Sequence, residues 1–190
     1  VTGFPALTAA NLPGFGRDHF QWMKSFDRLA GLLVLLHDQS SGSVRPGASL
    51  GSPEIRYGLE EEDRRQLTRG LVHSAEVLFA GGARRVVVPY WVDPLVLEPG
   101  DDLDAIEERG VREGEIGISA SHPQSTCGMG SDPSKSVVNA FGESHDVSGL
   151  FVADMSVFPT SLGAPPQITT AALADRTAHH ILERWPELGA

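Results

Sequence analysis

One stretch of strong helical periodicity constrains the fold most. Shorter apolar runs lie on either side of it. Within residues 60–80, apolar side chains recur at helical spacing: Leu67, Leu71, Ala75, Leu78 and Phe79. Acidic residues crowd the first turn and Gly81-Gly82 follow the last, which suits the helix dipole and a left-handed glycine cap. Gly70 lowers the helix propensity without interrupting the pattern. The sequence predicts one long helix here, and the helix explains the acidic cluster without a metal.

Apolar runs around this helix predict strands. Residues 30–36 read Ala-Gly-Leu-Leu-Val-Leu-Leu, and their length favours a buried strand, although periodicity alone leaves a helix open. Residues 54–57 and 84–90 predict two more strands, the last ending or lying at an edge because of Pro89. Residues 39–51 have the Ser, Gly and Pro content of a hairpin connection. The prediction is an α+β fold: an open mixed or antiparallel sheet with flanking helices.

The other segments complete this outline. Residues 1–15 are rich in Gly and Pro and predict a loop, and residues 15–27 predict a short helix packed on the core through aromatic side chains. Residues 91–114 predict loops around a short exposed helix. An apolar strand over residues 150–153 and a helix from Pro166 to about Leu182 then make a strand–loop–helix ending.

Composition excludes several classes of function. Hydrophobic residues make up 41% and charged residues 21% of the 190 residues, as in ordinary soluble globular proteins. The net charge of −10 argues against unaided binding to nucleic acid or to an anionic membrane. No apolar run reaches the roughly 20 residues that span a bilayer. Cys127 is the sole cysteine, so no internal disulfide forms, and the cellular compartment stays open. No spacing of His, Cys, Asp and Glu indicates a metal site.

Three motifs near the C-terminus carry the chemistry: HPQSTCGMG from His122, GLFVADMSVFPT from Gly149, and GAPPQITTAALADRTAHHI from Gly163. Pro123 holds His122 extended, and an imidazole with a pKa of about 6.5 exchanges protons near neutrality. Asp154 follows the apolar strand, where a carboxylate usually caps a turn. Pro166 suits a helix start, whose free N–H groups and dipole favour an anion.

In their order and spacing, these motifs resemble the C-terminal signature of the glucose–methanol–choline (GMC) oxidoreductases, which are FAD-dependent alcohol oxidases and dehydrogenases. A weaker resemblance reaches back to about Ala30 and is closest to the long-chain alcohol oxidase branch. The resemblance implies that residues 1–118 are part of a substrate-binding domain, its sheet forming one wall over the flavin. Residues 119–190 would carry the active-site histidine and complete the FAD-binding domain.

The resemblance also implies roles for individual residues. His122 would face the flavin and receive the alcohol proton as hydride leaves the carbon. Asp154 and Met155 would lie near the pyrophosphate and ribityl part of FAD. The helix start, Pro166, Gln167 and Ile168, would point at the pyrimidine edge of the isoalloxazine, where negative charge collects on reduction.

Two departures from the family pattern qualify these expectations. Most members carry His or Asn just before the proline that opens the last helix, whereas this chain has Pro165, which offers no side-chain donor or acceptor. The N-terminal Gly-x-Gly-x-x-Gly unit that binds the ADP half of FAD is absent. Gly14-Phe15-Gly16 lacks the preceding strand and the third glycine. We therefore expect an N-terminal FAD-binding chain or segment as partner.

The sequence thus predicts the C-terminal part of a flavoenzyme that oxidises an alcohol, with a hydrophobic alcohol favoured. The alternative is a non-catalytic binding or assembly subunit in which Pro165 marks decayed chemistry, and lyase or isomerase chemistry on flavin is a third possibility. Cys127, close to His122, is interpreted as a packed thiol and not as a redox centre.

Overall fold

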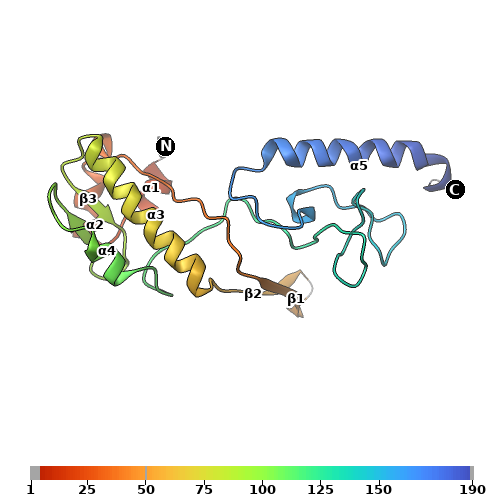
Figure 1. The fold of residues 1–190 in the computed structure, drawn as a ribbon, viewed down its shortest axis with the longest axis horizontal. Helices are drawn as coiled ribbons and strands as arrows, with labels where there is room; N and C mark the ends of the chain where they lie inside the picture. The colour runs from red at the N-terminus through yellow and green to blue at the C-terminus, as the bar shows by residue number, and fades with distance from the viewer. Residues whose placement is uncertain (1–4, 50, 189–190) are drawn as a thin grey trace. The chain divides into compact units, whose positions relative to one another are not determined.

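The computed structural model describes residues 5–49 and 51–188, which form two units of comparable size. The first contains residues up to Leu36 together with Leu59–Ser119, and the second contains His37–Gly58 together with the chain from Ala120 onward. The α+β class and the antiparallel pairing are confirmed, with the strands in two separate two-stranded sheets (Figure 1). The division by function into 1–118 and 119–190 stays a prediction.

The first unit is built on helix α3, Glu61–Ala80, which confirms the predicted long helix. It ends in a Schellman motif: the Gly82 N–H donates to the Phe79 carbonyl and the Ala83 N–H to the Leu78 carbonyl, both at 2.9 Å. Gly82, with φ +88°, takes the left-handed position that glycine adopts without strain.

Helix α3 packs against strand β3, Val86–Val88, which pairs antiparallel with β4, Leu95–Leu97, and against helix α4, Asp104–Arg109. The predicted third strand and the short helix are confirmed, and β4 was not predicted. The buried side chains of this core come from all four elements and the residues after β3: Ala75, Val86, Val88, Tyr90, Leu97 and Ile106.

Tyr90 closes this core. Its ring is fully buried, its hydroxyl donates to the Gly110 carbonyl at 3.0 Å, and the Arg109 guanidinium lies 3.8 Å from the ring centroid. Burial raises the pKa of the Tyr90 hydroxyl. Arg109 also donates to the carbonyls of Val92 and Asp93, so this arginine joins the loop after β3 to α4.

Two N-terminal helices belong to the first unit. Helix α1, Pro5–Asn11, lies in the segment predicted as loop, so that prediction is wrong for residues 5–11, whereas residues 12–15 form a loop as predicted. Proline at the first helical position, followed by alanines, supports this short helix. Helix α2, Arg17–Met23, confirms the predicted short helix, although it buries no residue fully; the 3₁₀ turn η1, Phe26–Arg28, follows it.

The prediction of a buried strand over residues 30–36 is wrong. The segment is extended but has no paired strand among the described residues, and Leu33 remains 74% exposed. An apolar run becomes a strand only when a neighbouring backbone accepts its hydrogen bonds. Val34 in this segment explains the glycine within α3. A Cβ added at Gly70 would lie 2.4 Å from Val34 Cγ1, so α3 needs glycine at that position.

The second unit holds the hairpin of β1, Gly42–Ser49, and β2, Ser52–Tyr57. The predicted strand 54–57 is confirmed, whereas the predicted connection 39–51 is mostly strand. Gly, Ser and Pro are tolerated there because the register shifts between Arg45 and Ser49, and proline fits such a bulge. At Gly47 the partner strand approaches too closely for any side chain.

Loops and one long helix make up the rest of this unit. Helix α5, Gln167–Leu188, begins where predicted and extends beyond Leu182. The predicted strand 150–153 is wrong: only Phe151 pairs, in a single bridge to Glu143. A second core forms instead from Val138, Val157 and Phe158, with Leu173 of α5 packed against it.

Candidate functional site

The segment that carries His122 is a loop held at its C-terminal end. The Cys127 N–H donates to the Ser156 carbonyl at 2.9 Å, and the Met129 N–H donates to the Val157 carbonyl at 2.8 Å. Ser125 has φ +69°, a left-handed conformation that non-glycine residues seldom adopt and that recurs at functional sites. His122 is half-buried, and among the described residues its imidazole has no hydrogen-bond partner.

Asp154 begins the short 3₁₀ turn η2, Met155–Val157. Its Oδ1 accepts the Ser156 N–H at 2.8 Å, and hydrogen bonds from Ser156 lower the pKa of the Asp154 carboxyl. This bears out the capping interpretation. The Met155 side chain packs against the second core. Asp154 therefore caps a turn and Met155 packs in a core, and their contact with FAD stays a prediction.

The start of α5 is open. The carbonyl of the buried Pro166 accepts the Thr170 N–H at 2.8 Å and the Thr170 hydroxyl at 2.9 Å. The N–H groups of Gln167, Ile168 and Thr169 have no hydrogen-bond partner among the described residues. The Ile168 side chain is 86% exposed beside them. This helix start thus presents backbone donors and an apolar side chain together.

A side-chain hydrogen bond joins the His122 loop to the turn before α5. Gln124 Oε1, two residues after His122, accepts the Leu162 N–H at 3.2 Å. The ladder from Cys127 to Ser156 brings the Asp154 turn to the same loop. All three sequence motifs therefore meet in the second unit, although they are spread over about sixty positions of the chain.

Sequence reasoning did not connect His37 with this site. A Cβ added at Gly163 would lie 2.7 Å from the His37 Cβ and 3.2 Å from its Cα, so the two backbones touch. Gly163 also has φ +63°, so glycine is needed there on both grounds. No local pattern links two positions so far apart, and only the fold brings them together.

The family description "GMC oxidoreductase", for the C-terminal region, matches residues 38–174, which is well over half of the chain. The chain belongs to the GMC oxidoreductase family.

Individual GMC relatives agree with this assignment. The long-chain-alcohol oxidase FAO4A of Arabidopsis thaliana is 33% identical over 90% of this chain and 24% of its own length. The 6'''-hydroxyparomomycin C oxidase of Streptomyces lividus is 37% identical over 53% of this chain and 20% of its own. The crystal structure of a pyridoxine 4-oxidase superposes with a TM-score of 0.51 at 26% identity, covering 77% of this chain and 28% of that one. The chain thus spans about a quarter of the length of these relatives and matches the C-terminal domain of a GMC oxidoreductase.

The residues of this GMC domain fit one part of a flavin. The open N–H groups of α5 suit a site of developing negative charge, and the exposed Ile168 suits a flat apolar ring. Nothing in the described residues supplies a glycine-rich turn between a strand and a helix, which is what a pyrophosphate would need.

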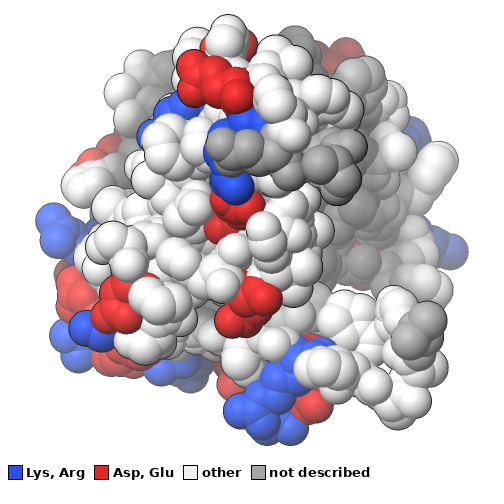
Figure 2. Space-filling model, turned by 90° about the vertical axis from the view of Figure 1, so that its right-hand side faces the viewer, with Lys and Arg blue, Asp and Glu red and all other residues white. Residues whose placement is uncertain are grey.

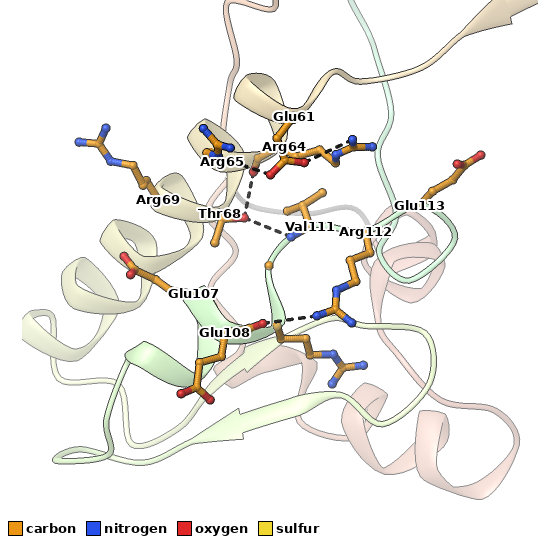
Figure 3. Close-up of a pocket in the computed structure, with 12 residues that line it drawn as sticks. Glu61, Arg64, Arg65, Thr68, Arg69, Glu107, Glu108, Val111, Arg112 and Glu113 are labelled. Atoms are coloured by element: carbon orange, nitrogen blue, oxygen red, sulfur yellow. Dashed lines mark hydrogen bonds and ion pairs between the residues drawn. The ribbon is translucent and has the colours of Figure 1, made fainter.

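A cleft of about 590 Å³ in the first unit has a different character. Arginines and glutamates of α3, of α4 and of the loop after α4 line it, as Figure 3 shows. Arg64 and Arg65 lie 3.4 Å from Glu61, and Thr68 accepts the Val111 N–H at 3.1 Å. None of the predicted site residues lines this cleft, and its charges largely neutralise each other.

The charged side chains on the face shown in Figure 2 do not mark a binding site either. In Figure 2, acidic and basic side chains are interspersed over the face in view, with uncharged surface between them. Within the described residues, no three His, Cys, Asp or Glu side chains are grouped for a metal ion. In the same part of the chain, no helix combines the length and apolarity needed to cross a bilayer.

Proposed function

We propose that this chain is the C-terminal part of an FAD-dependent GMC enzyme that oxidises an alcohol, with His122 as the group that accepts the hydroxyl proton. The observation that carries the proposal is the hydrogen bond from Leu162 to Gln124, which ties the His122 loop to the turn before the open start of α5. The His122 imidazole and the free N–H groups at the start of α5 then belong to one local structure.

The bonds of this reaction balance without further reactants. Bound FAD would accept the carbon-bound hydrogen with its electron pair. His122 would take the proton of the hydroxyl group, and the carbon and oxygen become a carbonyl. The N–H groups of Gln167, Ile168 and Thr169 would hydrogen-bond the site where negative charge gathers. Asp154 and Met155, at the turn beside this loop, would contact the ribityl and pyrophosphate region.

The proposed partner is an N-terminal FAD-binding segment or chain. The extended residues 30–36 support this, because their apolar side chains are exposed and their backbone groups are unpaired within the described residues. Residues 1–118 would form part of the substrate-binding domain, and residues 119–190 would complete the FAD domain. The substrate we favour is a hydrophobic alcohol, since several relatives are named long-chain-alcohol oxidases.

Pro165 is the residue that favours an alternative function without catalysis. With no hydrogen-bonding side chain at that position, the domain would serve as a non-catalytic binding or assembly subunit of the same fold.

The test is the replacement His122→Ala in the full-length enzyme. We expect alcohol-dependent flavin reduction, followed by anaerobic stopped-flow absorbance, to slow by roughly 10²–10⁴-fold, the usual contribution of a positioned acid–base group. Flavin content and melting temperature should stay close to wild type. Near-wild-type reduction in this variant would contradict the catalytic role and favour the assembly subunit.

A further inference from the structure

The candidate site lacks a hydrogen-bonding side chain at position 165. Pro165 is exposed just before α5 and has neither a side-chain donor nor an acceptor. An alcohol oxygen that gives up its proton carries developing negative charge, and a second hydrogen bond at that atom stabilises the transition state. If the reaction is the one proposed above, another residue must provide that group.

His37 lies at the same turn. Its Cα and Cβ are so close to Gly163 that no side chain fits between them. Gly163 is two residues from Pro165, and two residues span at most about 7 Å of chain. The backbone of His37 is therefore within the reach of an imidazole from the place where the polar side chain is missing.

The neighbouring contacts hold His37 in place. The Tyr57 hydroxyl donates to Asp38 Oδ2 at 2.6 Å, which attaches the chain directly after His37 to strand β2. On the other side of the turn, Leu162 is bonded to Gln124 of the His122 loop. His37 and His122 are thus both linked to the turn at Leu162-Gly163, one by packing and one through a hydrogen bond.

The other histidines make contacts of their own, apart from His19 of the first unit. His73 pairs with Glu76, His179 with Asp175, and His145 bonds the Gly130 carbonyl and Ser136. His180 stacks on Phe141 with ring centroids 4.0 Å apart. Among the described residues of the second unit, His37 and His122 are the two histidines whose rings have no partner.

We propose that His37 replaces the missing group at position 165 and that its imidazole hydrogen-bonds the oxygen of the alcohol whose proton passes to His122. This assignment rests on the proposed function. It gives the site two histidines from widely separated parts of the sequence, and Pro165 is then compatible with activity because His37 supplies the hydrogen bond.

The experiment compares His37→Ala, Pro165→Asn and the double variant in the full-length enzyme. Flavin reduction is measured with octan-1-ol, and binding is measured with 2-methylheptan-2-ol. This tertiary alcohol has a hydroxyl but no hydrogen on the same carbon, so it binds without reacting and is followed by its effect on the flavin spectrum. We expect His37→Ala to slow reduction by roughly 10-fold to 100-fold, as for one lost hydrogen bond to an oxygen that develops charge, and to weaken binding of the neutral tertiary alcohol by roughly 2-fold to 10-fold. Adding Pro165→Asn to His37→Ala should restore most of both losses.

His19→Ala is the matched control, because His19 also has no partner among the described residues but lies on α2 of the first unit. It should leave both measurements unchanged. An unchanged His37→Ala enzyme, or an effect of Pro165→Asn that is the same with and without His37, would overturn the assignment. If His122→Ala slows reduction while His37→Ala does not, only this inference fails. If neither octan-1-ol nor other alcohols reduce the flavin of the wild-type enzyme, both the proposed function and this inference fail.

Discussion

At the scale of single residues, the second unit contains an ion pair between Glu143, which is largely buried, and Arg184, which is partly buried. Glu143 is 8% exposed and accepts the Gly149 N–H at 3.0 Å and Arg184 Nη1 at 2.5 Å. The Gly149 hydrogen bond and the Arg184 guanidinium lower the pKa of the Glu143 carboxyl. Through this pair, the last turns of α5 are attached to the loop that carries the second core.

We expect Arg184→Ala to destabilise the protein by about 1–3 kcal/mol, because it leaves a largely buried carboxylate without its cation.

The contribution of Glu143 to stability should depend on pH. A carboxyl whose pKa is lower in the folded state stabilises the fold above its ordinary pKa of 4.5, and this contribution disappears as the pH falls through the lower folded value. Thermal unfolding should therefore show a gap between wild type and Glu143→Gln at neutral pH that narrows below 4.5, and a gap independent of pH would contradict the pairing.

Cys127 is the second residue whose role can be tested simply. It is half-buried, and its backbone N–H, not its thiol, connects the His122 loop to Ser156. We expect Cys127→Ser to keep most of the alcohol-dependent flavin reduction of the full-length enzyme. A loss as large as that of His122→Ala would make the thiol a participant in the chemistry.

At the scale of elements, Gly70 of α3 shows how tertiary contact overrides local preference. Its Cα faces the Val34 side chain, and an added Cβ would lie 2.4 Å from Val34 Cγ1. Sequence patterns alone assign Gly70 a cost of about 1 kcal/mol in helix propensity. The structure shows what that glycine allows: an extended segment packs directly on the helix.

Gly70→Ala should consequently destabilise the protein by about 1–3 kcal/mol, although alanine is the better helix former. Val34→Ala combined with Gly70→Ala should recover most of that loss, since the colliding methyl groups are gone. Chemical denaturation of the two single variants and the double variant measures the coupling. Simple additivity of the single effects would mean that the two residues do not touch.

Elements with their own periodicity or capping residues were predictable from the sequence, and those that depend on distant backbone were not. Helix α3 and the start of α5 are specified by local spacing, acidic residues and proline. Residues 30–36 and 150–153 have the composition of strands, but no neighbouring strand pairs with them along their length in the described residues. Strand β1 has the composition of a loop, but it pairs with β2. In the site, the motifs located His122 and the α5 start, whereas the contact of His37 with Gly163 depends on the fold.

At the scale of the whole molecule, the apolar surface of residues 30–36 matters most. Leu32, Leu33 and Leu35 are each about half exposed or more, and no strand covers them within the described residues. An exposed apolar surface of this kind promotes association. The relatives are about four times longer than this chain, which leaves length for the N-terminal segment proposed above to cover this surface.

We therefore expect the 190-residue chain, expressed alone, to be colourless and to aggregate. Leu33→Lys with Leu35→Glu should raise its solubility, and the same pair of changes should lower the yield of folded, flavin-containing full-length enzyme. Val77→Lys, on an exposed position of α3, is the control and should do neither. Gel filtration with absorbance at flavin wavelengths measures both effects. Stoichiometric FAD on the isolated chain would refute the need for a partner segment.

The interleaving of the two units has a consequence for exchanging parts between family members. Residues 37–58 belong with the chain after Ala120, so a chimera joined once near residue 119 would combine a hairpin from one parent with the site loops of the other. The contact of His37 with Gly163 would then join residues from different parents, whereas the hydrogen bond of Leu162 to Gln124 would come from one parent. A transplant that respects the structure needs three junctions, after Leu36, after Gly58 and after Ser119. Recombination in this family would be expected to carry the hairpin and the C-terminal motifs together as one heritable block.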